Sequence, residues 1–439
     1  MNATTRLQRP ITAAQGLRYG LLGLPLAFVA LPLYVVLPNH YAREFGVPLA
    51  TLGAVLLGAR LFDALIDPLI GRITDGLFAR SINAVLAWCA AACVVLGIGF
   101  AMLFFPPTRA PDALVAWASV VLVMTYAAYS ALSVAHQSWG AMLGGDEAQR
   151  SRIVSWREGL GLAGVLLASV MPALAGLGWT AAVFMVALLC GWLAWTRAPQ
   201  PTPSAQRAAF NLWLPFSRSA FRRLLAVFVL NGIASAIPAT LVLFFVQDRL
   251  QAPRSMEPAF LGSYFLCAAL SIPLWLQIVR RLGLARSWLC GMVLSMAVFI
   301  WATQLGAGDT VAFLVVCALS GLALGTDLAL PGAMLAGVIA EAGDRGQSEG
   351  AYFGWWNFAT KLNLALAAGL ALPLLGMFGY LPGARDGGAL HALTVAYCLL
   401  PCLLKLMAAL ALYLLVIRPA HRTLETNSNA DEGITRHGS

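Results

Sequence analysis

The stretch LLGARLFDALIDPLIGRITD, residues 56–75, carries Arg60, Asp63 and Asp67 among mostly apolar residues. A charge at the centre of a membrane helix costs roughly 2.5–3.5 kcal/mol on insertion scales, so three on one helix need a reason. At 100° per residue, the three positions fall within an arc of about 60° and form one stripe. We expect this stripe to face a bundle interior or a water-filled cavity. An Arg60–Asp63 ion pair that only holds the helix in place is the alternative, but it leaves Asp67 unexplained.

The composition of the whole chain predicts a membrane protein. Of 439 residues, 60% are hydrophobic and 11% are charged, and the mean hydropathy is +0.79, far outside the range of soluble domains. Apolar runs of about 20 residues, long enough to cross a bilayer, recur along the sequence. We interpret them as twelve transmembrane helices, at residues 17–38, 48–70, 83–105, 113–143, 153–174, 178–197, 223–246, 259–279, 287–305, 310–339, 350–376 and 391–417.

The net charge of +9 follows membrane topology rather than indicating a nucleic-acid partner. The first apolar run is too long for a signal peptide and lacks a cleavage pattern, so we expect the N-terminal tail to be retained. With the N-terminus inside, the outer side holds few arginines, namely Arg43, Arg109, Arg249, Arg254 and Arg385. The positive-inside rule then predicts a multi-pass inner-membrane protein with both termini in the cytoplasm. The eight cysteines fall inside predicted spans and are interpreted as small apolar residues.

A polar stretch and a repeated word divide the chain into two halves. Residues 198–222 are rich in Pro, Ser and Arg, and the word GAML occurs at 140–143 and again at 332–335, at the end of the fourth span of each half. Two parallel repeats of six helices are typical of the major facilitator architecture. We therefore predict an all-α membrane protein with two pseudo-symmetric bundles. The predicted parts are bundles at 1–197 and 223–417, a cytoplasmic linker at 198–222 and a cytoplasmic tail at 418–439.

The two lysines of the chain, Lys361 and Lys405, both lie inside predicted spans. A lysine ammonium responds readily to its surroundings, which suits a group that exchanges partners during a cycle. Lys361 shares a small and polar helix face with Gly350, Gly354 and Asn357, and this face can approach the bundle centre. We predict a functional role for Lys361 and interpret Lys405 as a snorkelling side chain.

Polar residues on other spans complete the candidate set. Ser130, Ser133 and Gln137 recur at helical spacing in the fourth span with His136 beside them, although intramembrane serines often serve only helix packing. Asp327 in the tenth span is a candidate partner for Lys361 or another basic residue. The charges at the start of the fifth span form a gate or are ordinary interfacial groups; they are Arg157 and Glu158.

Three segments resemble the glycoside–pentoside–hexuronide:cation symporters, the melibiose permease family of the major facilitator superfamily. ARLFDALIDPLIGRITD (59–75) is similar to the second-helix signature A-R-x-x-D-A-x-x-D-P-x-x-G of that family. EGAYFGWWNFATKLNLALAAGLALPLLG (349–376) is similar to its eleventh helix, and RSRIVSWR (150–157) keeps two arginines seven residues apart. The resemblance extends over essentially the full length.

Carried over residue by residue, the resemblance implies that Asp63 and Asp67 are cation-binding carboxylates, with hydroxyls from Ser130 and Ser133. They would bind a metal ion only if the coupling ion is Na⁺; H⁺ is the alternative, and no cofactor is expected. Ser133 stands where the melibiose permease has a third aspartate, and the first span carries no acidic residue, so the solute stays open. The predicted coupling or gating residues are Arg60, Lys361, Asp327 and Arg157.

The sequence thus predicts a cation-coupled symporter of a small solute, a sugar or glycoside by resemblance, which acts as a monomer by alternating access. An amphipathic or lipid-like solute and a non-transporting receptor of the same fold are the alternatives. An intramembrane hydrolase is disfavoured because Ser133 and His136 lack a fixed acid and the nucleophile-elbow pattern is absent; a channel is disfavoured because no filter-like loop occurs. The predicted solute-binding residues are Tyr129, His136, Gln137, Trp355, Trp356 and Asn357.

Overall fold

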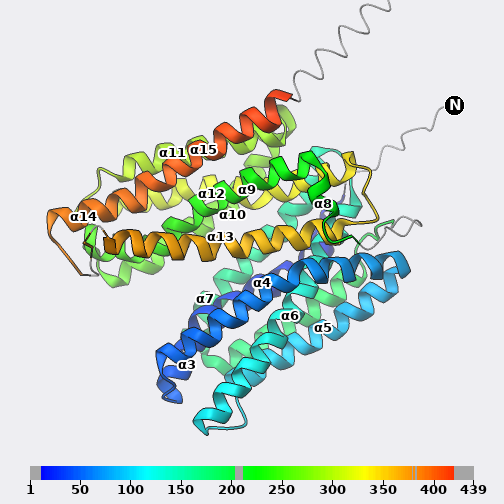
Figure 1. The fold of residues 1–439 in the computed structure, drawn as a ribbon, viewed down its shortest axis with the longest axis horizontal. Coiled ribbons are helices and arrows are strands. Elements are labelled where there is room, and N and C mark those ends of the chain that lie inside the picture. Colours follow the sequence, from blue (N-terminus) through cyan, green and yellow to red (C-terminus); the bar gives the residue numbers. More distant parts are fainter. Residues whose placement is uncertain (1–10, 203–210, 378, 381–382, 420–439) are drawn as a thin grey trace, which may run out of the picture. The chain divides into compact units, whose positions relative to one another are not determined.

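The computed structural model describes residues 11–202, 211–377, 379–380 and 383–419, and these residues form helices joined by short connections (Figure 1). The N-terminal tail up to residue 10, the middle of the predicted linker (203–210) and the predicted C-terminal tail from residue 420 lie outside the described residues. Contacts between Cα atoms divide the chain into two compact units. Unit 1 contains residues 1–215 and 332–361, and unit 2 contains residues 216–331 and 362–439.

The helices of unit 1 follow the apolar runs of the sequence. An α-helix pairs its backbone N–H and C=O groups within the segment, which is a requirement in lipid because no water is available there. These helices are α1 (Ala13–Gly20), α2 (Gly23–Leu31), α3 (Leu37–Glu44), α4 (Leu49–Arg80), α5 (Ile82–Phe104), α6 (Pro111–Leu143) and α7 (Glu147–Thr196), with the short α8 (Leu214–Ser217) at its boundary.

One sharp bend divides α7 into two membrane spans. Gly176 has φ +78° and ψ 172°, a conformation that only glycine adopts without strain. The segments on either side, Glu147–Pro172 and Leu174–Thr196, are each long and apolar enough to cross a membrane. The fifth and sixth predicted spans therefore correspond to the two halves of α7, whose helical hydrogen bonding continues across the bend.

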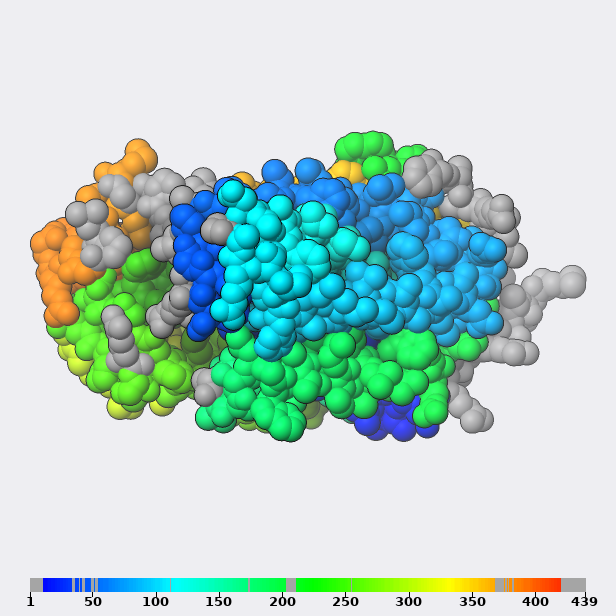
Figure 2. Space-filling model, turned by 90° about the horizontal axis from the view of Figure 1, so that it is seen from below, coloured from blue at the N-terminus to red at the C-terminus, as the bar shows by residue number. Residues whose placement is uncertain are grey.

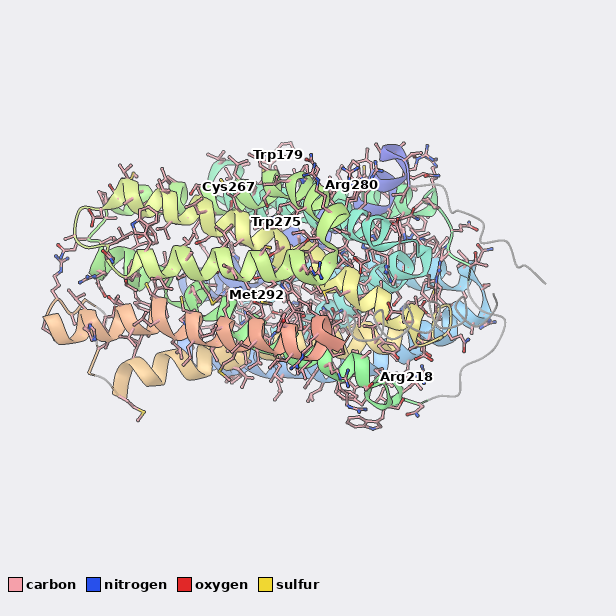
Figure 3. All side chains as sticks on the ribbon, turned by 90° about the horizontal axis from the view of Figure 1, so that it is seen from above. Trp179, Arg218, Cys267, Trp275, Arg280 and Met292 are labelled. Carbon is pink, nitrogen blue, oxygen red and sulfur yellow. The ribbon has the colours of Figure 1, made fainter. Side chains whose placement is uncertain are left out.

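Unit 2 contains α9 (Ser219–Phe244), α10 (Glu257–Leu282), α11 (Leu284–Ala302), α14 (Gly387–Thr394) and α15 (Leu400–Leu412). Trp275 and Met292, which Figure 3 labels, are buried in it, whereas Arg280 is exposed. The π-helical turn Val395–Leu399 joins α14 to α15 within one apolar segment, Gly387–Ile417. Two long helices contribute to both units: α12 (Thr310–Glu341) divides after Pro331, and α13 (Glu349–Met377) divides after Lys361.

The surface of unit 1 has the character expected in lipid. Figure 2 shows α5 and α6, in light blue and cyan, packed side by side on one face. Large apolar side chains on these helices point outward, among them Val94, Ile98, Met102, Val120 and Met124. A water-soluble monomer rarely exposes contiguous apolar surface, so this face fits a membrane environment.

The twelve predicted spans all fall largely within helical segments of the structure. Ten helices of the described part of the chain are long and apolar enough to span a membrane, and the other two predicted spans, 48–70 and 350–376, correspond to α4 and α13. The predicted all-α membrane architecture is confirmed. The predicted boundaries of two six-helix bundles stay a prediction, since contacts group residues 332–361 with the N-terminal unit.

Candidate cation-coupling site

The charged stripe of α4 meets the lysine of α13 inside unit 1. The Lys361 ammonium lies 2.7 Å from a carboxylate oxygen of Asp63 and 2.7 Å from one of Asp67. The Ser130 hydroxyl on α6 donates to Asp63 Oδ1 at 2.7 Å and accepts from Lys361 Nζ at 2.9 Å. Both carboxylates are almost fully buried, whereas the Lys361 side chain is 20% exposed. One ammonium therefore lies between two carboxylates and a hydroxyl.

The local charge of this cluster does not balance. Two ionised carboxylates and one ammonium give a net charge of −1 in a buried position, which is unfavourable without a further counter-charge. Asp67 Oδ1 has no hydrogen-bond partner within the described residues, so one oxygen of the cluster keeps its full accepting capacity. The arrangement can take up one more positive charge, as a proton or as a small cation.

A second contact fixes the other end of the same helix pair. The Asp75 carboxylate near the end of α4 accepts the N–H groups of Gly350 at 2.6 Å and Ala351 at 2.9 Å, and it pairs with Arg72 at 3.0 Å. A carboxylate at a helix N-terminus is favoured by the helix dipole and by the unpaired N–H groups there. The eleven residues from Gly350 to Lys361 rise about 17 Å, close to the rise from Asp75 back to Asp63. The two helices thus run antiparallel, with an anchor at each end.

Glycines let the backbones of α4 and α13 come close between these anchors. A Cβ atom on Gly71 would lie 2.0 Å from the Gly350 carbonyl oxygen, and one on Gly354 would lie 2.6 Å from the Asp67 carbonyl oxygen. Contacts this short exclude any side chain at these positions. The small residues therefore determine how near Lys361 comes to the carboxylates.

Glu349 is a further buried acid at the start of α13, before the predicted span 350–376. Its Oε1 accepts the Gly346 N–H at 2.7 Å, and its Oε2 has no partner within the described residues. Burial raises the pKa of this carboxyl to about 7.

The remaining predicted residues of the fourth span lie elsewhere in unit 1. Ser133 accepts a hydrogen bond from Gln137 at 2.8 Å. His136 is fully buried, and its Nε2 lies 2.8 Å from the Tyr19 carbonyl oxygen, with the ring packed against Tyr19 and Trp195. Tyr129 is half-buried on the same helix, α6. His136 thus has the surroundings of a core residue.

The predicted residues of α13, α4 and α7 have different surroundings, and Arg157 lines a small pocket together with Gln137. Trp355 donates to the Leu212 carbonyl at 2.8 Å, Trp356 is buried and Asn357 is half-buried. Arg60 is exposed, in contrast to the two aspartates of its stripe. Arg157 pairs with the adjacent Glu158 at 2.5 Å, and both side chains are half-buried, so the two alternatives of a gate and of ordinary interfacial groups stay open.

Asp327 belongs to unit 2, where its partner is the second lysine. Lys405 Nζ lies 3.0 Å from Asp327 Oδ2 and 2.9 Å from Asn231 Oδ1, and the Lys405 side chain is only 7% exposed. The interpretation of Lys405 as a snorkelling side chain is wrong, because its ammonium is neutralised inside the bundle and does not reach an interface. Asn231 and Ser235, which both donate to Asp327, were not predicted from the sequence. Two polar residues one helical turn apart in an apolar span are the signal that could have indicated this network.

A family model described as "MFS/sugar transport protein" matches residues 18–418, nearly the whole chain. The chain belongs to this family. The MFS/sugar transport family consists of transporters and not of enzymes, so the chain is a multi-pass transporter of the major facilitator superfamily. The predicted membership and the predicted non-enzymatic function are confirmed.

Two curated relatives from Escherichia coli (strain K12) support the same assignment. The protein named as a glycoside/cation symporter, YagG, is 26% identical over 161 residues, which are 36% of this chain and 34% of YagG. The inner membrane symporter YicJ is 25% identical over 131 residues, 30% of this chain and 28% of YicJ. The chain therefore matches about a third of the length of each relative.

Solved structures of major facilitator proteins share the fold. A bacterial homologue of the iron transporter ferroportin in an outward-facing state aligns with a TM-score of 0.67 at 18% identity, covering 91% of this chain and 100% of that chain. The E. coli fucose:proton symporter FucP aligns with a TM-score of 0.63 at 13% identity, covering 90% and 98%. At these identities the likeness establishes the fold alone.

Proposed function

We propose that the protein is a symporter that couples the entry of Na⁺ or H⁺ to the transport of a small solute. The observation that carries the proposal is the position of Lys361 Nζ, 2.7 Å from the carboxylates of both Asp63 and Asp67. An ammonium in this position substitutes for the monovalent cation that two carboxylates and a hydroxyl would otherwise bind.

The charge of the cluster gives the coupling a physical basis. An entering cation or proton neutralises the net charge of −1 and competes with Lys361 for the carboxylate oxygens. Release of the lysine weakens one of the two anchors between α4 and α13. We infer that this change favours the conformation that completes the transport cycle.

The solute class comes from the relatives. YagG is named a glycoside/cation symporter and YicJ an inner membrane symporter. We propose a sugar or glycoside as solute, the inner membrane as location, cytoplasmic termini and a monomer as the working unit.

Ion binding to the purified protein tests the coupling site without knowledge of the solute. Replacement of choline chloride by NaCl at constant ionic strength, or a change of pH between 5.5 and 8, is expected to shift the thermal unfolding midpoint. Saturation at 100 times the dissociation constant would add about 2.7 kcal/mol to the free energy of unfolding. The double variant Asp63→Asn/Asp67→Asn is expected to lose the Na⁺ response, or the corresponding part of the pH response, whereas Asp112→Asn, at an exposed position of α6, keeps it.

Transport in proteoliposomes tests the full proposal. An inward Na⁺ or H⁺ gradient is expected to drive accumulation of at least one member of a panel of radiolabelled sugars and glycosides. Asp67→Asn should lower this accumulation at least tenfold, and Asp112→Asn should leave it unchanged. Accumulation that needs no ion gradient, or that survives loss of both aspartates, contradicts the proposal.

A further inference from the structure

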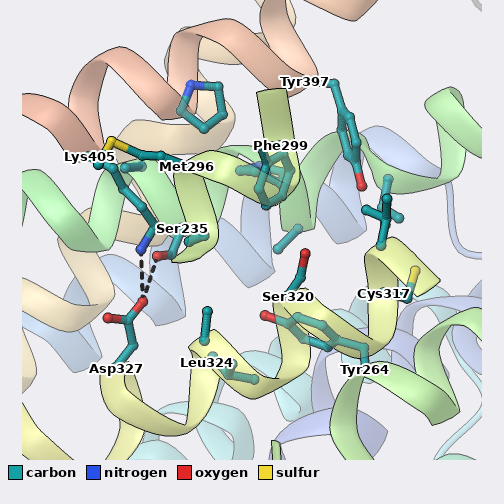
Figure 4. Close-up of a pocket in the computed structure, with 18 of the residues that line it drawn as sticks. Ser235, Tyr264, Met296, Phe299, Cys317, Ser320, Leu324, Asp327, Tyr397 and Lys405 are labelled. Atoms are coloured by element: carbon teal, nitrogen blue, oxygen red, sulfur yellow. Dashed lines mark hydrogen bonds and ion pairs between the residues drawn. The ribbon is translucent and has the colours of Figure 1, made fainter. Parts of the chain in front are cut away.

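Unit 2 contains a partly open cavity of about 310 Å³ between α9, α10, α11, α12 and α15 with the π-helical turn before it (Figure 4). All residues that line it belong to unit 2, and none of them belongs to the Lys361 cluster. Its walls are largely apolar and aromatic. The side chains that form them include Phe260, Tyr264, Phe265, Met296, Phe299 and Tyr397.

A neutral ion pair forms the polar end of this cavity. Asp327 accepts hydrogen bonds from Asn231 at 3.0 Å, Trp288 at 2.8 Å, Ser235 at 3.1 Å and Lys405 at 3.0 Å. Four donors satisfy the carboxylate and hold it in place. Because the lysine balances its charge, the polar end has no net charge.

Hydrogen-bonding capacity is left over at the cavity wall. The Ser320 hydroxyl has no partner within the described residues, although Ser320 is only 8% exposed. In Figure 4 the hydroxyls of Ser320 and Tyr397 point into the space between the lining side chains. The bonds of Lys405 to Asp327 and Asn231 use two of its three N–H donors. A buried polar group without a partner is costly, so these groups favour a ligand that can bond to them.

We propose that this cavity binds an uncharged molecule with an apolar body of one or two rings and a hydroxyl-bearing end. The apolar body would pack on the aromatic walls, and the hydroxyl would accept from Lys405 and bond to Ser320. A net charge on the ligand is excluded because it would enter an apolar cavity without a counter-charge. The volume of the cavity lies at the lower end of the range for small-molecule pockets, which is about 300–1,000 Å³. The ligand must therefore be small.

A packing defect explains these features less well. Interiors of proteins are close-packed, and an engineered cavity of about 150 Å³ already binds benzene. The cavity in unit 2 is larger, and the buried Ser320 hydroxyl at its wall has no hydrogen-bond partner within the described residues. The binding site itself does not depend on the proposed function. Only a role of its ligand as the transported solute would rest on that function.

Equilibrium dialysis against protein in lipid nanodiscs tests the site with three probes that share one ring system. The probes are naphthalene-2-methanol, 2-naphthoate and 2-naphthylmethylammonium, with binding to empty nanodiscs subtracted. We expect the uncharged alcohol to bind at least tenfold more tightly than either ion. Ala239→Trp, at an exposed position of the cavity wall, should weaken the alcohol at least tenfold, and Val315→Trp, an exposed position of α12 outside the lining, should not.

Charge variants test the role of the ion pair. Asp327→Asn leaves Lys405 unbalanced and is expected to shift the preference at least tenfold toward 2-naphthoate. Lys405→Met should shift it toward the ammonium probe, and the double variant Asp327→Asn/Lys405→Met should restore the preference for the alcohol. If the single charge variants do not fold, Ala239→Trp and Ser320→Leu supply the test.

Several results would overturn the inference. Equal binding of the three probes, binding unaffected by Ala239→Trp, or a co-purified lipid that the alcohol cannot displace would each do so. The assay contains no ion gradient, which separates its outcome from that of the proposed function. Gradient-driven transport without this binding pattern removes the inference alone, and this binding pattern without gradient-driven transport removes the proposed function alone.

Discussion

Buried carboxylates in unit 1 are stabilised to different degrees by their neighbours. Asp63 and Asp67 share an ammonium, and Asp75 accepts two backbone N–H groups and pairs with Arg72. Glu349 accepts the Gly346 N–H on Oε1, and its Oε2 has no partner within the described residues, while burial is the largest influence on its carboxyl. Its neutral form is therefore favoured in the folded protein, and its ionisation opposes folding.

The raised pKa of Glu349 predicts a pH-dependent gain from Glu349→Gln. The folded-state pKa of about 7 exceeds the ordinary value of 4.5, so this carboxyl destabilises the fold as pH rises from 4.5 through 7. Glutamine keeps an acceptor for the Gly346 N–H and carries no charge. We expect the difference in unfolding midpoint between the variant and wild type to be larger at pH 8 than at pH 5. The corresponding gain in the free energy of unfolding is at most about 3 kcal/mol.

Glu341→Gln, an exposed change at the end of α12, is the control and should show no such pH dependence. The same midpoint difference for Glu349→Gln at pH 5 and pH 8 would show that Glu349 does not titrate in this range.

The contact between α4 and α13 depends on glycine as much as on charge. Gly71 and Gly350 bring the two backbones together between the Asp75 anchor and the Lys361 anchor. A bulkier residue would push the helices apart, because the neighbouring atoms are backbone and cannot rotate away.

Gly71→Ala is expected to lower the free energy of unfolding by about 1–3 kcal/mol through this overpacking. It should also weaken the Na⁺ or pH response of the purified protein, since Lys361 would move away from the carboxylates. Gly76→Ala on the same helix has no atom within 4 Å of the added Cβ and should be neutral or stabilise by up to about 1 kcal/mol. Thermal unfolding of both variants measures the difference, and equal midpoints would show that the close contact is unimportant.

The sequence predicts the buried positions of Asp63 and Asp67 on α4 because charges in an apolar span are few and their helical spacing is unambiguous, whereas Arg60 of the same stripe is exposed. Lys361 was likewise recognisable as one of two lysines in the chain. The packed position of His136 was not predictable, since α6 is apolar on most faces and its pattern does not distinguish a packed face from a cavity face. The burial of Lys405 was not predictable either, because depth within a span depends on which neighbours supply a carboxylate.

The charges of the chain as a whole predict its orientation in the membrane. Arginines gather in the connections that the twelve-span interpretation places inside, and few lie in those placed outside. Translocation of a short, arginine-rich loop is unfavourable, so this asymmetry predicts the direction of the first span and of those after it.

Cysteine labelling in right-side-out bacterial membrane vesicles checks this orientation. Ala110→Cys lies between the third and fourth predicted spans, on the predicted outer side, and Thr202→Cys lies in the predicted cytoplasmic linker; both positions are exposed. A membrane-impermeant maleimide is expected to label Ala110→Cys at least tenfold faster than Thr202→Cys in sealed vesicles, and the two at similar rates after permeabilisation. Wild-type protein, whose eight cysteines lie in the predicted spans, gives the background. Faster labelling of Thr202→Cys in sealed vesicles would mean the opposite orientation, and the coupling ion would then enter the predicted site from the other side.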